Sequence, residues 1–296
     1  MIKTPHKDKL IAAMANKGCK DDISLLQEAL KAYESWIGKI SALDTTGKQK
    51  VLDLSRLLNE YKDYLEVELI AQKGSSFLKR QKGQIKLDNS ILEEALMHLV
   101  DPTVIGGLPS FELELGPHTA FLSLSFRPSS ISALNEKPDV VLKTKDQDFT
   151  IGKTLRYQIS ATDHFAKNKT AEGNLFLAVL SAEIKVNYDK TMFQECCGTA
   201  SRLKQGCPMA KYYVLVEHLD MEPEDIRLTD IDNVFLLRHA KRLPQHKRGV
   251  YEEVRAQHAN FPIDGEVIYR FVEEIQGFIQ AVWFDPEAAL TRGSFK

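Results

Sequence analysis

Residues 174–187, which read NLFLAVLSAEIKVN, contain the pattern that decides the fold. The run LFLAVL is apolar at every position, as expected of a central strand covered on both faces. The strand then continues through Glu183, Ile184 and Lys185. Because side chains two apart on a strand share a face, Glu183 and Lys185 point the same way and Ile184 points to the core. Opposite charges at the end of a buried strand are costly unless they are paired, so they indicate a site, with a surface ion pair on an edge strand as the alternative.

The elements around this strand indicate an α/β fold with a mixed sheet flanked by helices. Asp189 or Thr191 can cap a helix that Gly206 and Pro208 would end. The apolar run at residues 212–216 predicts a further buried strand. Upstream, a proline ends one helix, and several segments alternate with the two-residue period of strands. We expect that helix at residues 90–100 and strands at residues 111–115, 121–126, 139–142 and 234–237.

The amino-terminal part of the chain indicates a mainly α-helical region. Apolar residues recur at three- and four-residue spacing over residues 23–40 and again over residues 51–65, as on one face of an amphipathic helix. Residues 44–47 supply a polar break, so we expect two antiparallel helices. We place the helical region at residues 1–100 and the α/β domain at residues 101–296. The helical pair either completes the core or forms a subunit interface or DNA grip, and spacing alone does not separate these alternatives.

Composition and charge limit the function. Of the 296 residues, 43% are hydrophobic and 27% charged, which is ordinary for a folded protein. The formal net charge of −2 gives no overall positive field, so nucleic-acid binding would need a local basic surface. The four cysteines lack the spacing of a zinc site or a disulfide framework, and we expect them to be packing residues. No segment has the character of a signal peptide or a membrane span, so we expect a cytoplasmic protein without a membrane contact.

Two short motifs carry a resemblance to a known superfamily. Pro138-Asp139 and Glu183-Ile184-Lys185 resemble the PD-(D/E)XK signature of restriction-endonuclease-like nucleases. The surrounding order of helix, strands, helix and strand is similar to the core of that superfamily, so the resemblance implies a restriction-endonuclease-like fold. Asp139 and Glu183 lie further apart than is usual, which implies an insertion, a polar hairpin around residues 143–173. Asp163 is the alternative for the first acid.

Two carboxylates and a lysine at adjacent strand ends suit phosphodiester hydrolysis. Carboxylate oxygens bind Mg²⁺, which stabilises charge on a phosphate and acidifies the attacking water. A lysine beside them can hold the water or a phosphate oxygen. The resemblance implies that Asp139, Glu183 and the Ile184 carbonyl bind Mg²⁺ and that Lys185 assists the nucleophile. Further polar candidates near the site are Glu93, Glu94, Glu112, Glu114, Gln194 and Glu195.

Contacts to DNA would come from basic loops. The densest basic stretch is residues 239–248, HAKRLPQHKR, which follows the strand expected at residues 234–237. Lysine and arginine in such a loop can neutralise phosphates, and arginine can read guanine, whereas a solvated loop is the alternative. A smaller basic group precedes the helix at residues 90–100. The candidate DNA-binding residues are Lys241, Arg242, Lys247 and Arg248, and the smaller group is Lys79, Arg80 and Lys82.

The arrangement of the whole chain is similar to the subunits of BbvCI-type restriction endonucleases, with a helical amino-terminal part and a late catalytic core. That resemblance implies a type II restriction subunit that cuts one strand of double-stranded DNA with Mg²⁺ at a short, asymmetric site. It also implies a partner, either a second homologous nuclease subunit or a second copy of this chain. Two other functions stay open: a different PD-(D/E)XK nuclease in repair, recombination or phage defence, and a non-catalytic DNA-binding or assembly subunit with the same core.

Overall fold

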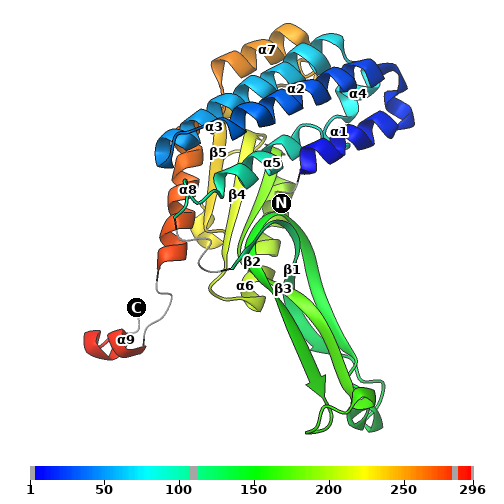
Figure 1. Cartoon of the computed structure of the whole chain (residues 1–296), viewed down its shortest axis with the longest axis vertical. Helices are drawn as coiled ribbons and strands as arrows, with labels where there is room; N and C mark the ends of the chain where they lie inside the picture. The colour runs from blue at the N-terminus through cyan, green and yellow to red at the C-terminus, as the bar shows by residue number, and fades with distance from the viewer. Residues whose placement is uncertain (1–3, 107–111, 282–285, 295–296) are drawn as a thin grey trace.

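A mixed sheet forms the centre of the molecule in a computed structural model that describes residues 4–106, 112–281 and 286–294 (Figure 1). Its strands follow the chain in the order β1-β2-β3-β4-β5. The first two pairings are antiparallel, and β3, β4 and β5 run parallel. The predicted α/β fold with a mixed sheet is confirmed. The strands are β1 (Glu114–Phe126), β2 (Val140–Ser160), β3 (Thr170–Tyr188), β4 (Lys211–Leu219) and β5 (Asn233–Lys241).

The predicted helices of the amino-terminal region are present. The two amphipathic stripes form α2 (Ile23–Ser41) and α3 (Gly47–Lys62), and the third predicted helix is α5 (Asn89–Leu99). A π-helical segment, η2 (Asp63–Ala71), continues α3. The remaining helices are α1 (Pro5–Ala15), α4 (Ser76–Gln81), α6 (Lys190–Gly206), α7 (Tyr251–Asn260), α8 (Gly265–Gln280) and α9 (Pro286–Arg292), with 3-10 turns at Lys17–Asp22, Ser132–Asn135, Lys167–Lys169 and Ile226–Leu228.

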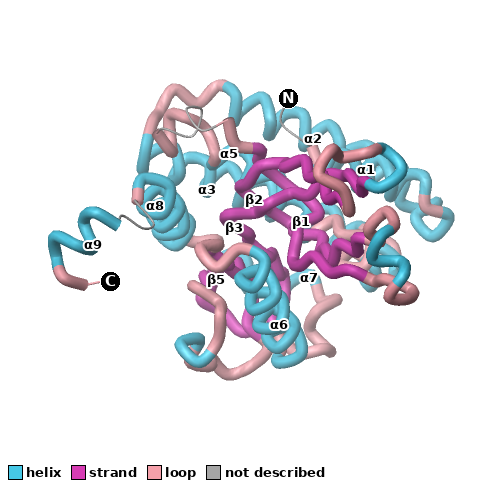
Figure 2. Tube along the Cα trace, turned by 90° about the horizontal axis from the view of Figure 1, so that it is seen from below, coloured by secondary structure: helices cyan, strands magenta, loops and turns pink. Residues whose placement is uncertain are grey.

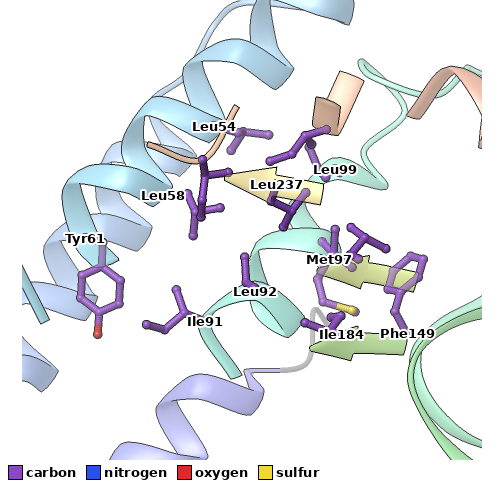
Figure 3. Close-up of a cluster of buried hydrophobic side chains, with 14 of the residues drawn as sticks. Leu54, Leu58, Tyr61, Ile91, Leu92, Met97, Leu99, Phe149, Ile184 and Leu237 are labelled. Carbon is purple, nitrogen blue, oxygen red and sulfur yellow. The ribbon is translucent and has the colours of Figure 1, made fainter. Parts of the chain in front are cut away.

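One hydrophobic core joins these helices to one face of the sheet (Figure 3). Leu58 of α3 and Leu92 of α5 pack in it with Ile184 of β3 and Leu237 of β5. Burying each such side chain contributes about 1.5–3 kcal/mol, which is why the helical stripes and the apolar strand faces meet here. The predicted domain boundary near residue 100 falls within this shared core and stays a prediction.

Helix α6 covers the opposite face of the sheet. Of the two predicted caps, Asp189 is the one that caps it, by accepting a hydrogen bond from the Met192 backbone N–H at 2.9 Å. Its apolar side chains, among them Phe193 and Cys196, pack on Val214 and other residues of β4 in a second core. Cys196 and Cys19 are buried and form no disulfide with another described residue, in agreement with their predicted packing role.

Strands β1, β2 and β3 extend away from the body as a long arm (Figure 1). β2 pairs with β1 over residues 140–152 and with β3 over residues 149–160, so it changes partner where it leaves the body. Gly152 permits this close approach, because a Cβ there would lie 2.3 Å from the Leu177 carbonyl oxygen. Both ends of β2 reach the arm tip, where Asp139 and Ser160 line one pocket.

The arm shows where the predicted insertion lies and corrects one predicted strand. Most of the insertion expected at residues 143–173 is a hairpin of β2 and β3, which pair antiparallel and are connected by residues 161–169. Its mixed polar sequence reflects a strand exposed on more than one side. The strand expected at residues 111–115 begins only at Glu114, and residue 111 lies outside the described residues. No helix in the described part of the chain has the length and apolar character to cross a membrane.

Candidate active site

Glu183 and Lys185 lie side by side on β3, as their spacing predicts. Lys185 Nζ is 2.7 Å from Glu183 Oε1, and their side chains are only 23% and 13% exposed. Ile184 between them points into the core beneath the helices. Glu183 pairs with Val214 on the neighbouring strand, so the parallel strands β3 and β4 hold its backbone in place. The interior of the sheet therefore fixes the orientation of both charged groups.

The acid that the structure brings to this pair is Asp148. It directly precedes Phe149, which lies opposite Ala182 on β3. Its Oδ2 accepts a hydrogen bond from the Ile184 backbone N–H at 2.9 Å, and its side chain is 15% exposed. Against β1, β2 carries an extra residue at this point, a bulge of the kind that re-aims side chains beside active sites.

The electrostatics of the site show that two carboxylates compete within it. Burial, followed by the negative charge of Glu183, raises the pKa of Asp148 to about 6. Burial alone would lower the pKa of Lys185, but the adjacent Glu183 carboxylate outweighs that effect and raises it, so the lysine is a firm cation. Glu183 Oε2 is buried and has no hydrogen-bond partner within the described residues. A positive charge placed between the carboxylates would relieve their repulsion and satisfy this oxygen.

The residues present fit a divalent cation of the Mg²⁺ type. Mg²⁺ takes one or two carboxylates and completes its shell with water and substrate phosphate oxygens. Asp148 and Glu183 supply two such carboxylates, and the Ile184 carbonyl is a further oxygen on the same strand. Within the described ranges, no group of three or more His, Cys, Asp or Glu side chains is placed to hold a metal. The described residues alone would thus leave most of the shell to water and substrate.

Asp139 does not meet Glu183, which corrects the expectation drawn from the Pro138-Asp139 motif. It lies just before β2, is 50% exposed, and pairs with Arg127 at 3.0 Å. The pocket that it lines includes Ser160, which pairs with Thr170 at the far end of β3 from Glu183. The alternative, Asp163, is exposed in the connection after β2. Both acids are at the arm tip because β2 runs the length of the arm twice.

A sequence signal for Asp148 exists beside the short motif. Asp148 immediately precedes the buried stretch from Phe149 to Ile151, just as Glu183 and Lys185 adjoin a buried strand. The signal is an acid beside a short buried segment, without a preceding proline. The sequence does not show that this part of β2 lies beside Ile184, since the pairing of β2 with β3 sets that.

Of the other polar candidates, Glu93 is the one that approaches Asp148. Lys86, in the segment between α4 and α5, is 3.8 Å from a carboxylate oxygen of both. The negative charge of Glu93 also contributes to the raised pKa of Asp148. Glu94 points elsewhere and accepts the hydroxyl of Tyr33 at 2.5 Å. The rest also lie away from the pair: Glu112 contacts Lys153, Glu114 accepts the Thr154 N–H, and Gln194 and Glu195 are exposed on α6.

The four basic residues selected for DNA binding are all engaged by carboxylates. Arg242 lies 2.9 Å from Asp220 and Lys247 lies 2.8 Å from Glu253. The other two pairs are Lys241 with Glu222 and, at 3.6 Å, Arg248 with Asp220. Lys82, in the smaller basic group, is paired with Glu66 at 2.9 Å. DNA phosphates would have to displace these carboxylates, so their role in DNA binding stays a prediction.

The raised pKa of Asp148 makes a prediction for the metal-free protein. A carboxyl whose pKa is raised by folding destabilises the fold once it ionises. The destabilisation by Asp148 therefore grows as the pH rises from 3.8, the ordinary pKa of an aspartate, to about 6, its pKa in the fold. In EDTA at pH 7.5, Asp148→Asn is therefore expected to match or exceed the wild type in urea denaturation. The advantage should shrink below pH 4. This account would be wrong if Asp148→Asn lost stability relative to the wild type as the pH rises from 4 to 7.5.

Comparison with known proteins places this geometry in context. A family model described as the Bpu10I restriction endonuclease matches residues 84–295. A solved structure described as the native BbvCI A2B2 tetramer at low resolution has the same fold, with a TM-score of 0.56 and 19% sequence identity. That similarity covers 93% of this chain and 96% of the other chain. No match is found among curated proteins.

Proposed function

This chain belongs to the Bpu10I restriction endonuclease family, and on that premise we propose that it hydrolyses one strand of double-stranded DNA with Mg²⁺. In this proposal it is one subunit of a type II restriction enzyme and cuts at a short, asymmetric site. The observation that carries the proposal is the convergence of Asp148 on Glu183 and Lys185, two buried carboxylates and a lysine at the meeting of β2 and β3.

The chemistry follows from the positions of these groups. Asp148, Glu183 and the Ile184 carbonyl would hold Mg²⁺, which would supply charge stabilisation to the phosphate and acidify a bound water. Lys185 stays protonated and donates a hydrogen bond to that water or to a non-bridging phosphate oxygen. The water gives up a proton to solvent and its oxygen bonds to phosphorus as the P–O3′ bond breaks. The leaving 3′-oxygen takes a proton from solvent, so the products are a 5′-phosphate and a 3′-hydroxyl. Glu183 also orients Lys185 through their contact.

The partner in this proposal is a second nuclease subunit, either homologous or a further copy of this chain. A chain with one active site hydrolyses one phosphodiester, so a double-strand break at an asymmetric site needs a second catalytic centre. The structure described as BbvCI is an A2B2 tetramer, which supports a hetero-oligomeric arrangement here. The proposal is compatible with a chain that nicks DNA slowly by itself.

Cleavage of plasmid DNA tests the proposed function. The chain alone, and the chain co-expressed with a homologous subunit, would be incubated with plasmid DNA and Mg²⁺, and the ends sequenced. We expect ends at one recurring sequence, with the chain cutting one strand, and no cleavage in EDTA. Thermal melting with and without Mg²⁺ gives a second readout, with a higher midpoint expected in Mg²⁺.

The other outcomes identify the alternatives. Cuts that follow DNA ends or branches instead of a sequence would place the chain among structure-directed nucleases and contradict site-specific restriction. No cleavage and no Mg²⁺-dependent rise in melting temperature, with DNA binding intact, would indicate a non-catalytic subunit.

A further inference from the structure

Strand β2 presents two exposed stretches that carry free cations. Residues 143–146 and 153–156 are exposed on the arm on either side of the bend at Asp148. Lys143 and Lys145 lie in the first stretch and Arg156 in the second. None of these three has a carboxylate or hydrogen-bond partner among the residues that the structure describes. Lys153 differs, since it contacts Glu112 at 3.5 Å.

The lack of a carboxylate partner among the described residues distinguishes these three cations from those of the basic loop after β5. There, each of the four cations already contacts a carboxylate, so its charge is partly neutralised. An unpaired lysine on a strand can give its whole charge to a ligand and needs no bond to be broken first. The acid within the same stretch, Asp146, accepts the Thr119 hydroxyl at 2.6 Å and leaves the lysines without a direct partner.

All three cations lie on the arm side of the candidate active site, because β2 folds back near Asp148 and both of its ends reach the arm tip. Lys145 lies three positions before Asp148 and Lys143 five, which corresponds to roughly 10 and 17 Å in an extended strand. Lys86 approaches Asp148 from the helical region at 3.8 Å. Viewed along the arm, β2 lies on the side toward α5 and α1, and α6 lies on the opposite side (Figure 2). A polyanion lying against β2 would therefore approach the arm from the side opposite α6.

We propose that Lys143, Lys145 and Arg156 of β2 bind the DNA backbone on the arm side of the cleaved phosphate. This inference rests on the proposed nuclease function and names the surface that holds its substrate. The chain as a whole has a net charge of −2, so backbone binding requires such a local surface. The arm supplies it with cations that no carboxylate contacts within residues 4–106, 112–281 and 286–294.

The salt dependence of DNA binding tests the proposal. The full chain, in EDTA to prevent cleavage, would be titrated with a fluorescent mixed-sequence duplex at a series of KCl concentrations. Removing Z phosphate contacts lowers the slope of log K against log[salt] by about 0.9Z, so Lys143→Gln/Lys145→Gln/Arg156→Gln is expected to lower it by about 2.7. The matched control changes three surface cations that already contact carboxylates, Lys48→Gln/Arg56→Gln/Arg227→Gln, and is expected to keep the wild-type slope.

The remaining outcomes separate this inference from the function on which it rests. A wild-type slope in the β2 variant, or an equal loss in the control, would overturn the assignment to the arm while leaving the nuclease function intact. A wild-type chain that shows no salt-dependent binding to DNA would overturn both. Because the substituted side chains are exposed, melting curves should coincide with wild type, and Lys143→Arg/Lys145→Arg should retain the slope.

Discussion

Asp148→Asn is expected to reduce Mg²⁺-dependent cleavage by about a thousandfold or more, whereas Asp139→Asn leaves it within about twofold of wild type. The two substitutions make the same chemical change. Asp148 contacts the backbone beside Glu183 and is mostly buried, whereas Asp139 pairs with Arg127 at the arm tip. The measurement is the initial rate of cleavage of one supercoiled plasmid at saturating Mg²⁺, compared between the wild type and the two variants. The reverse ranking would restore Asp139 as the metal ligand and refute the site described here.

Two further substitutions test the separate roles of Glu183 and Lys185. Glu183→Gln keeps the shape of the side chain but removes the charge that raises the pKa of Lys185, so it should lose both Mg²⁺ stabilisation and cleavage. Lys185→Met should lose cleavage while keeping the Mg²⁺-dependent rise in melting temperature, because the lysine is no metal ligand. If Lys185→Met lost Mg²⁺ binding too, its separate role toward the phosphate or the water would be wrong.

The second large effect is expected in the body of the molecule, where a buried ionic cluster joins the helical region to the sheet. Lys62 of α3 lies 3.1 Å from Glu217 of β4 and 2.5 Å from Glu66 of the π-helical segment. Arg238 of β5 lies 2.7 Å from the other oxygen of Glu217, and all four side chains are nearly or fully inaccessible to solvent. Breaking such a cluster leaves an unpaired buried charge, which costs about 3–5 kcal/mol.

Glu217→Gln is therefore expected to lower the free energy of unfolding by about 3–5 kcal/mol in urea denaturation at pH 7. Glu60→Gln is the matched control, since Glu60 pairs with Lys39 and Arg56 on the surface and should cost less than about 1 kcal/mol. Equal midpoints for the two variants would show that the cluster contributes no more than a surface pair.

The pH dependence of this difference has a definite sign. Burial alone would raise the pKa of Glu217, but Lys62 and Arg238 outweigh it and lower the pKa to about 2. A carboxyl whose pKa is lowered by folding contributes stability above its ordinary pKa and loses it as pH falls through the folded value. The gap between wild type and Glu217→Gln should thus be constant above pH 5 and narrow between about pH 4.5 and 2.

Local patterns account for most of the elements and for half of the site. The stripes that predict α2 and α3, the apolar run that predicts β3, and the cap at Asp189 are all short-range signals, and each holds in the structure. Glu183 and Lys185 are supported in the same way, because the two-residue period of a strand fixes which side chains share a face. These inferences need only neighbours in the chain.

The first acid required information of another kind. Asp139, Asp148 and Asp163 are all acids on or beside β2, and only its bend and its register with β3 decide that Asp148 meets Glu183. Likewise, the basic loop after β5 is dense in the sequence, but carboxylates brought from other segments pair each of its selected cations. A sequence shows which charges a chain carries, not which of them its fold neutralises.

The stretch NLFLAVLSAEIKVN therefore determined by itself the central strand, the shared face of Glu183 and Lys185, and the kind of chemistry they suit. The tertiary structure alone decided which carboxylate completes the pair and which cations stay free on β2. The physical reason is the sequence separation of the interacting residues. Periodicity and capping act within a few residues, whereas strand register and ion pairing join residues that are tens of positions apart. Asp148 and Glu183 meet because the hydrogen bonds between two strands hold them together.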